Sequence, residues 1–403
     1  MKSAKLELVF WLLCGVIAVL IPVAKLYVPL VIGVTTIVGL INWAPKNRLN
    51  NMLVCMLGYY VLVAFGLLFS ENYVVAAKQL ELKLSLVIFP CLFLLAPAPS
   101  SVWVRRIFLG FALATMGFIG FSLVNAFLDY SITGNPREFS YRELALNYHP
   151  TYVAAYCCFT ALILLLKSPQ TGIGRILGGV AYILIALFVA LLSSKAGWLC
   201  QGFILFFFLV LAWMRKGPGR LHFVWQGAAL VAFSLALVFS PGSQRRLTEA
   251  VDSTQNIGSH EVANSSSSVR IVAWRSAIHI IATNPFGVGT DDVAQALVEE
   301  YSKRGETFAE EKRLNAHNQY LQTGVEFGWF GLGLLLFLLW SMLKRAHEQR
   351  NWLFLGFTLL ILANMLFESF LELQQGIVFV AFMLVVFSLD ETEPSRAFSE
   401  NGD

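Results

Sequence analysis

Charged residues are scarce in this chain. Only 13% of the 403 residues are Asp, Glu, Lys or Arg, whereas 57% are hydrophobic. A soluble domain has roughly a quarter of its residues charged, because its surface must face water. The net charge of +4 is also small and dispersed, which argues against a nucleic-acid partner. The composition therefore excludes an ordinary soluble protein and makes the hydrophobic runs the main source of information.

The sequence also lacks the usual patterns of metal-binding and disulfide-bonded proteins. It contains no CxxC, no Cys/His zinc spacing, no HExxH helix and no DxD acidic pair. Its six cysteines all lie inside apolar runs: Cys14, Cys55, Cys91, Cys157, Cys158 and Cys200. We therefore expect no metal site, no cofactor and no role for cysteine chemistry.

The hydrophobic residues are clustered in runs close to the ~20 residues that cross a bilayer as a helix. Such runs occupy about 8–24, 27–44, 50–70, 76–97, 106–128, 150–167, 176–194, 196–214, 221–240, 320–343, 351–369 and 374–389. The sequence therefore predicts an all-α integral membrane protein with about twelve transmembrane helices. Nine of them lie in residues 1–240 and three in residues 321–389, and the first is an uncleaved helix.

The distribution of Lys and Arg predicts the orientation of these helices. Short loops on one side carry most of the basic residues, and by the positive-inside rule that side is cytoplasmic. Both termini are then cytoplasmic, including the polar tail 390–403, which we expect to be disordered. The long segment 241–320, between the ninth and tenth helices, lies outside, as does a smaller loop at about 129–149.

The outer segment 241–320 is too long for a simple connection in a compact protein, so we expect it to have a function. Residues 269–281 predict a helix that follows a serine-rich stretch, and Asn284-Pro285 ends it. Phe286-Gly287-Val288-Gly289 then allows a tight turn. The segment is therefore predicted to be partly helical.

Two side chains of the predicted helix suit an anionic ligand. Arg270 and Trp274 are four residues apart and share a face, whereas Arg275 points well away. A guanidinium beside an aromatic ring near the bilayer surface can bind a phosphate through two hydrogen bonds. The alternative is an interfacial arginine that reaches lipid headgroups.

A candidate general base stands where the outer segment returns to the membrane. His317 begins the run His317-Asn318-Gln319-Tyr320. A neutral imidazole can take a proton from a hydroxyl near neutral pH, and Asn318 could orient the ring or a sugar. The alternative is a structural histidine at a helix start.

Further polar residues stand at or near the same outer side. Lys195 occupies an outer turn between two predicted spans, and Arg142 and His149 lie in the smaller outer loop. His149 could contact a substrate or anchor the start of a helix. Lys83 lies inside a span, where a charge usually faces a cavity or a partner. A site rich in cations, without carboxylate ligands for a metal ion, suits a lipid-linked diphosphate.

Three motifs in the outer segment carry a resemblance to a known family. They are Arg270-x-x-x-Trp274, Pro285-x-Gly287-Val288-Gly289, and His317-Asn318-x-Tyr320-Leu321 followed by Gly328 and Gly331. In order, spacing and placement they resemble the O-antigen ligase/polymerase superfamily over roughly residues 190–340. The resemblance implies a GT-C-like helical bundle whose large periplasmic loop carries the chemistry.

The resemblance also implies a reaction. Such enzymes move a glycan from undecaprenyl diphosphate to an acceptor at the periplasmic face of the bacterial inner membrane, and ligases use the lipid A–core oligosaccharide as the acceptor. The expected partners are thus the lipid-linked donor, the lipid A–core acceptor and membrane lipids. The expected transfer is metal-independent and inverts the anomeric centre.

The same resemblance implies roles for three residues. His317 is expected to be the catalytic base, and Arg270 and Lys195 are expected to contact the diphosphate. Position and side-chain chemistry, and not the family, make Arg142 and Lys83 further expected diphosphate contacts. On the same grounds, the residues expected to orient substrate are Asn318, Trp274, Tyr320 and His149. The family tends to show Ser-Arg-Gly/Ala where this chain has Ser194-Lys195-Ala196, so the charge is kept but the planar fork of arginine is lost.

Two alternatives stay open. A polymerase of the same superfamily would use the same residues, although the chain length and the single large outer loop favour a ligase. A lipid-linked-glycan flippase or transporter would tend to show internal repeats and helix breaks near the midplane, and neither is visible in the sequence.

Overall fold

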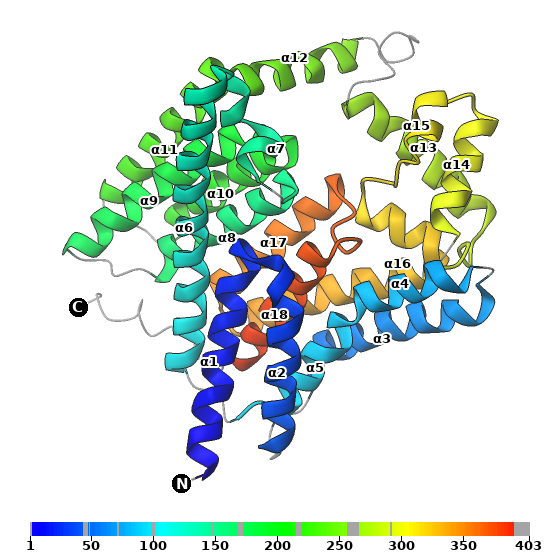
Figure 1. Cartoon of the computed structure of the whole chain (residues 1–403), viewed down its shortest axis with the longest axis horizontal. Coiled ribbons are helices and arrows are strands. Elements are labelled where there is room, and N and C mark those ends of the chain that lie inside the picture. Colours follow the sequence, from blue (N-terminus) through cyan, green and yellow to red (C-terminus); the bar gives the residue numbers. More distant parts are fainter. Residues whose placement is uncertain are drawn as a thin grey trace.

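The computed structural model of the chain is helical throughout the residues that it describes (Figure 1). It describes residues 2–42, 47, 49–70, 72–97, 101–146, 148–167, 172–214, 220–255, 266–290 and 292–390. Within these ranges no residue belongs to a β-strand. The predicted all-α class is confirmed, whereas the tail 391–403 and Asn147 lie outside the described residues.

The helices follow one another along the chain with short connections. The first part of the chain forms α1 (Lys2–Val23), α2 (Val28–Ile41), α3 (Asn51–Gly66), α4 (Tyr73–Lys83), α5 (Ser85–Leu95), α6 (Ser101–Thr133) and α7 (Tyr141–Leu144). The middle forms α8 (Pro150–Lys167), α9 (Gly172–Leu191), α10 (Lys195–Met214), α11 (Arg220–Phe239), α12 (Pro241–Gln255), α13 (Ser266–Thr283), α14 (Val293–Lys303) and α15 (Thr307–Glu311). The last part forms α16 (Gln319–Glu348), α17 (Trp352–Phe367) and α18 (Gln374–Leu389). Single 3-10 turns lie at Lys25–Tyr27, Leu67–Phe69 and Pro136–Phe139.

Several helix starts follow from asparagine in the sequence. Asn50, Asn72, Asn318 and Asn351 precede α3, α4, α16 and α17, and each side chain accepts a hydrogen bond from the backbone N–H three residues later. This contact satisfies one of the free N–H groups at a helix start. The cap at Asn318 matters most here, because it sets the beginning of α16 directly after His317.

Each of the twelve predicted spans coincides with a helix or a helix pair. In the described part of the chain, five helices are long and apolar enough to cross a bilayer: α1, α6, α8, α9 and α16. The bent pair of α11 and α12, with an angle of 78° at the break, makes a sixth, and most of the remaining apolar helices are shorter. The structure therefore supports a multi-pass membrane protein, and the count of twelve spans stays a prediction.

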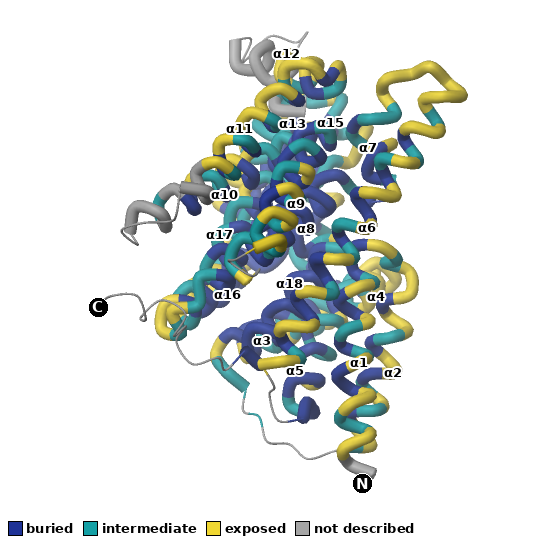
Figure 2. The backbone as a smooth tube through the Cα atoms, turned by 90° about the vertical axis from the view of Figure 1, so that its left-hand side faces the viewer, coloured by how far each residue is buried: buried dark blue, intermediate teal, exposed yellow. Residues whose placement is uncertain are grey.

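The centre of the helical bundle is formed by α8 and α18. Every residue of α8 from Pro150 to Ile163 is buried, and so is every residue of α18 from Gly376 to Leu389. A helix that is apolar on all sides belongs inside a bundle. Aromatic rings join these helices to their neighbours, as where Phe111 of α6 stacks on Phe379 of α18 at 5.5 Å. Exposed residues lie along the outer helices (Figure 2). Many of them are large and apolar, as expected for a surface that faces lipid.

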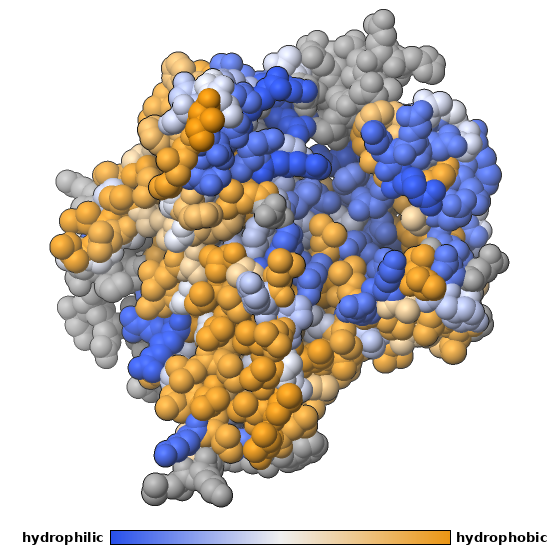
Figure 3. All heavy atoms as spheres, viewed as in Figure 1, coloured by the Kyte–Doolittle hydropathy of each residue, from blue (hydrophilic) through white to orange (hydrophobic). Residues whose placement is uncertain are grey.

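The outer segment has a small core of its own. Residues of α13, α14 and α15, with Ala316 and Val325, form a separate hydrophobic cluster. Helix α13 covers the helix predicted at 269–281. In Figure 3 hydrophilic side chains gather over the end of the molecule where α7 and α13 to α15 lie, whereas hydrophobic ones cover α1 and α2. Polar surface is thus concentrated at one end of the molecule.

The glycine-rich turn after α13 packs against α16. The N–H of Gly289 donates to the carbonyl of Glu326 at 3.1 Å, and the N–H of Trp329 donates to the carbonyl of Pro285 at 3.0 Å. Between these bonds Gly328 adopts φ 62° and ψ −153°, which breaks the helical course of α16. Only glycine adopts that conformation readily. The turn therefore attaches the outer segment to the helix that follows His317.

Candidate functional site

The backbone around His317 presents the imidazole by a local turn. His317 has a positive φ of 45°, and its N–H donates to Oδ1 of Asn315 at 3.0 Å. Asn318 then caps α16 with its Oδ1, while its Nδ2 donates to the carbonyl of Leu366 at 3.0 Å. The side chain of Asn318 is thus engaged with the protein on both ends, which gives it a role in holding the turn against the end of α17.

A carboxylate that sequence reasoning missed lies beside the histidine. Glu368 directly follows the last residue of α17 and is 6% exposed. Its Oε1 lies 3.5 Å from Nδ1 of His317. That distance is within ion-pair range, whereas Nδ1 of His317 has no hydrogen-bond partner among the described residues. A catalytic contact that is long without substrate often tightens when substrate binds. A site of cations and one histidine was expected, whereas the structure places an acidic residue among them.

The two nitrogens of His317 face different surroundings. Nδ1 is buried and has Glu368 as its nearest charged neighbour, whereas 27% of the side chain is exposed. The exposed part therefore lies on the other atoms of the side chain, and Nε2 is the nitrogen that a substrate can approach.

Arg270 and Trp274 approach the same region from α13. The ring of Trp274 lies 6.4 Å from that of Phe367, the residue before Glu368. Nε of Arg270 and Nε1 of Trp274 are both buried, and neither has a hydrogen-bond partner among the described residues. Two buried donors on one helix face are a costly arrangement unless an acceptor joins them. The shared face that the i, i+4 spacing predicted is therefore suited to an anion or another acceptor.

His149 completes the group from the start of α8. Its backbone N–H donates to Oε1 of Gln375 at 3.3 Å, and its Nδ1 is buried with no hydrogen-bond partner in the described part of the chain. Burial lowers the pKa of the His149 imidazole, although Glu368 raises it, and the nearby cations Arg142, His317 and Arg270 lower it further. His149 is therefore held as a neutral imidazole over a wider pH range than a free histidine.

The charges of the group affect one another. Burial raises the pKa of Glu368, but His317 and Arg270 outweigh it, and the pKa ends below its usual value. Burial lowers the pKa of Arg270, while Glu368 and Tyr141 raise it. Glu368 is therefore an ionised centre around which His317, His149 and Arg270 gather, and we name these four residues the His317 cluster.

Arg142 and Tyr141 border the His317 cluster on α7. Arg142 is exposed, and its guanidinium lies 6.0 Å from the ring centre of Tyr141. Arg246 of α12 lies over the same ring at 4.2 Å. Arg246 was not expected from the sequence, because only the fold brings α12 back to α7.

Lys195 lies near the start of α8. It is the first residue of α10 and is half-buried. Oγ of the preceding Ser194 is 3.2 Å from Oγ1 of Thr151, two residues beyond His149. The Ser194-Lys195-Ala196 turn therefore packs against the segment that carries His149, and the role of Lys195 toward a diphosphate stays a prediction.

The structure gives Lys83 a different environment from the one expected of a diphosphate ligand. Its side chain is fully buried, and Nζ lies 3.0 Å from Oε2 of Glu326 and 3.4 Å from Oε1 of Glu372. Two carboxylates thus already surround this ammonium. The diphosphate contact of Lys83 stays a prediction. In the structure the Lys83 ammonium has the geometry of a buried ion pair.

The predicted residue Tyr320 and the surface residue His279 also have structural partners. The Tyr320 hydroxyl donates to the carbonyl of Leu362 at 3.2 Å, which joins α16 to α17. His279 lies on the surface 3.8 Å from Glu300, which also contacts Arg304. The histidine of α13 is therefore part of a surface ion cluster, separate from the His317 cluster.

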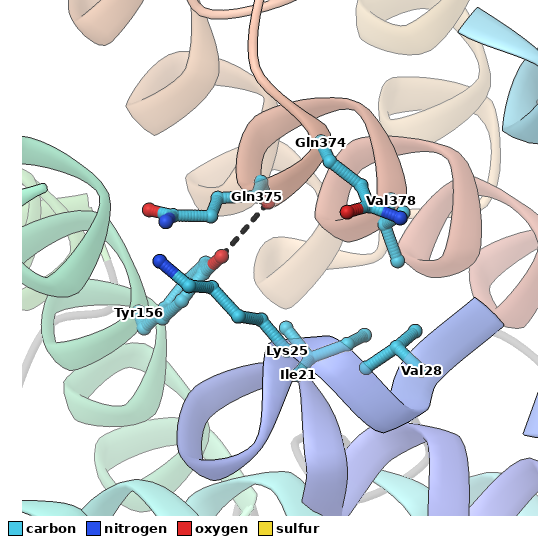
Figure 4. Close-up of a pocket in the computed structure, with 7 residues that line it drawn as sticks. All are labelled: Ile21, Lys25, Val28, Tyr156, Gln374, Gln375 and Val378. Atoms are coloured by element: carbon cyan, nitrogen blue, oxygen red, sulfur yellow. Dashed lines mark hydrogen bonds between the residues drawn. The ribbon is translucent and has the colours of Figure 1, made fainter. Parts of the chain in front are cut away.

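A pocket lies next to the His317 cluster, on the other side of Gln375. Lys25 from the turn after α1 reaches toward Tyr156 and Gln375, with Ile21, Val28, Gln374 and Val378 around it (Figure 4). The Tyr156 hydroxyl donates to the backbone carbonyl of Gln375 at 2.8 Å, while the side chain of Gln375 accepts from His149. Gln375 therefore lines this pocket and also contacts the backbone of His149 in the His317 cluster.

Side chains that could hold a metal ion are not gathered in the described part of the chain. No group of three or more His, Cys, Asp or Glu residues there has the geometry of a metal site. The residues of the His317 cluster can offer proton transfer at His317 and charge stabilisation by Arg270.

Comparison with known proteins confirms the resemblance that the motifs indicated. Residues 180–336 match the family model described as O-Antigen ligase. The match runs from α9 into α16 and includes Lys195, Arg270, Trp274 and His317, whereas His149 and Glu368 lie outside it. A search of curated proteins found no match.

Proposed function

With residues 180–336 matching the O-antigen ligase family, we propose that this chain transfers a glycan from undecaprenyl diphosphate to the lipid A–core oligosaccharide at the periplasmic face. One observation carries the proposal. The matched segment supplies His317 and Arg270, two residues of one half-buried polar cluster. Nε of Arg270 has no hydrogen-bond partner among the described residues, and the His317 side chain is partly exposed.

The proposed reaction starts at Nε2 of His317. This nitrogen takes the proton of an acceptor-sugar hydroxyl, while the hydroxyl oxygen forms a bond to the anomeric carbon of the donor. The bond from that carbon to the phosphate oxygen breaks, and its electron pair stays on the oxygen. Undecaprenyl diphosphate leaves as an anion from the opposite face of the sugar, so the anomeric configuration inverts, and the proton on His317 passes to water.

Cations stabilise the leaving group in this scheme. Charge on the diphosphate grows as the bond breaks, and fixed donors aimed at growing charge lower the barrier most. Arg270 supplies a half-buried guanidinium whose Nε has no hydrogen-bond partner among the described residues, and Lys195 and Arg142 supply further positive charge. Trp274 offers its indole N–H beside Arg270, as a contact for the phosphate or the sugar.

A genetic experiment tests the acceptor. Lipopolysaccharide from a strain that lacks the gene is separated on a gel, and undecaprenyl-linked glycan is measured in parallel. Uncapped lipid A–core with long polymer left on undecaprenyl diphosphate is the expected result. Core capped by a single repeat unit would indicate a polymerase instead, and an unchanged gel would overturn the proposed acceptor.

A purified variant tests the base. His317→Ala is expected to lower the release of undecaprenyl diphosphate by on the order of 10²- to 10⁴-fold, which is the usual contribution of general-base catalysis. His279→Ala is the matched control, because this exposed histidine lies outside the His317 cluster. Near-normal turnover in the His317→Ala protein would overturn the proposed mechanism.

A further inference from the structure

Glu368 is a buried ionised group that the proposed reaction does not use. It lies in the loop between α17 and α18, outside the matched residues 180–336, and its carboxylate faces His317 at 3.5 Å. His149 from the start of α8 and Arg270 from α13 also act on it. Burying a charge is costly unless several partners offset the loss of water, so its position beside the histidine requires an explanation.

The loop that carries Glu368 is held by the residues that immediately follow His317. Asn318 donates to the carbonyl of Leu366 at 3.0 Å, and Oε1 of Gln319 accepts from the N–H of Leu371 at 2.6 Å. One bond therefore lies on each side of Glu368. The position of the carboxylate and the position of the imidazole are thus fixed by the same short stretch of chain.

The opposite side of the loop is held by α8. The Tyr152 hydroxyl donates to the carbonyl of Ser369 at 3.3 Å, and the Tyr152 ring stacks on Phe370 at 4.6 Å. Both Tyr152 and Phe370 are fully buried. Glu368 therefore has little freedom to swing away from Nδ1 of His317, which is the condition for orienting a ring precisely.

The other buried carboxylates nearby face a different partner. Glu326 and Glu372 both contact Lys83. Glu372 belongs to the same loop as Glu368, only four residues further on, yet its charge is directed to that lysine. In this loop the carboxylate of Glu368 therefore faces His317, and that of Glu372 faces the buried ammonium of Lys83.

We infer that Glu368 is the positioning residue for His317, an inference that rests on the proposed function. The carboxylate favours the tautomer with hydrogen on Nδ1, which leaves the lone pair of Nε2 toward the acceptor hydroxyl. It also stabilises the imidazolium that forms when Nε2 takes the proton. A carboxylate beside a histidine base performs these two tasks in other hydrolases and transferases, without becoming protonated itself.

The experiment measures glycan transfer by the purified full-length protein across a range of pH. Glu368→Gln is expected to lower kcat on the order of 10²- to 10⁴-fold with little change in the KM for the donor, because a glutamine can hold the ring in the wrong tautomer. The acid limb of the rate profile is expected at lower pH, since the negative charge beside the imidazolium is gone. Glu368→Asp restores the charge and is expected to keep more activity than Glu368→Gln.

Two comparisons separate this role from a structural one. Glu372→Gln removes a carboxylate from the same loop without touching His317, so it can lower thermal stability but leaves the acid limb in place. A His149→Gln background removes the other imidazole that faces Glu368, and the shift caused by Glu368→Gln is expected to persist there. Arg270 remains in every variant as a constant positive neighbour.

The outcomes distinguish the inference from the function beneath it. If His317→Ala is inactive while Glu368→Gln retains wild-type kcat and acid limb, the proposed base stands and the inference falls. If Glu368→Gln and Glu372→Gln lose activity equally with unshifted profiles, Glu368 has only a structural role and the inference also falls. If the wild-type protein transfers no glycan, the proposed function itself has failed. If His317→Ala transfers glycan at the wild-type rate, the proposed base has failed and the inference falls with it.

Discussion

At the scale of single residues, the site contains side chains with buried hydrogen-bonding atoms that have no partner among the described residues. Arg270 and Trp274 each keep a buried donor without a partner among the described residues, and His149 keeps a buried ring nitrogen. In a folded protein such groups are rare, because leaving one unpaired costs about 1–3 kcal/mol. Their convergence near one carboxylate marks a place prepared for a polar ligand.

The first prediction concerns the fork of Arg270. Arg270→Lys keeps the charge but loses the planar pair of donors, so transfer is expected to fall about 10- to 100-fold, the value of one charged hydrogen bond. Arg275→Lys is the control, since Arg275 is exposed on another face of the same helix. The measurement is the rate of donor consumption by the two purified variants. An Arg270→Lys protein with the wild-type rate would argue against a phosphate contact through two hydrogen bonds.

At the scale of elements, the motif Pro285-x-Gly287-Val288-Gly289 acts through the backbone. Its turn exchanges hydrogen bonds with α16 on both sides of Gly328. A Cβ on Gly328 would come within 2.0 Å of the Pro285 carbonyl oxygen, and one on Gly287 would come within 2.4 Å of the Glu326 carbonyl oxygen. The glycines therefore allow two backbone segments to touch, and this contact orients the outer helices relative to α16.

The second prediction tests that contact. Gly328→Ala places a side chain in a conformation that costs about 1–3 kcal/mol even without a clash, and the clash adds to it, so a marked fall in thermal stability and activity is expected. Gly333→Ala lies in the same helix with nothing within 4 Å of its Cβ position, and should be neutral or slightly stabilising. Unfolding midpoints in detergent provide the measurement; equal midpoints for the two variants would contradict the proposed close contact.

At the scale of the whole molecule, one buried ion pair joins three distant parts of the chain. Lys83 ends α4, Glu326 lies in α16, and Glu372 lies in the loop before α18. Gln319 extends the network, because its Nε2 donates to Oε1 of Glu372 at 3.3 Å. The loop that carries Glu368 is therefore connected to the N-terminal helices as well as to α8.

The third prediction concerns this network. Lys83→Met leaves two buried carboxylates without their cation and is expected to cost about 3–5 kcal/mol of stability. Adding Glu326→Gln to Lys83→Met should recover part of the lost stability, because it removes one of the two carboxylates that no longer have a cation. Thermal unfolding measures the stability of the variants, and the KM for the donor tests the expected diphosphate contact of Lys83. A double variant that is stable but binds the donor poorly would support that contact.

Composition and periodicity by themselves determined the class of this protein. A continuous apolar run long enough to cross a bilayer must form a helix, because inside the bilayer only a helix satisfies all the backbone hydrogen bonds of such a segment. The all-α membrane class and the positions of the helices therefore follow from the sequence. Local rules also determined the helix at α13 and the shared face of Arg270 and Trp274, because i, i+4 geometry is independent of the rest of the fold.

Only the tertiary structure decided which charges meet. Glu368 is 51 residues from His317 along the chain (368 minus 317), and no periodic pattern links them, so their pairing at 3.5 Å arises from how α16 and α17 pack. Contacts between other distant elements direct Lys83 of α4 to two carboxylates and bring Arg246 of α12 to Tyr141 of α7. Helix formation is a local property of the backbone, whereas electrostatic partners depend on contacts between segments far apart in sequence.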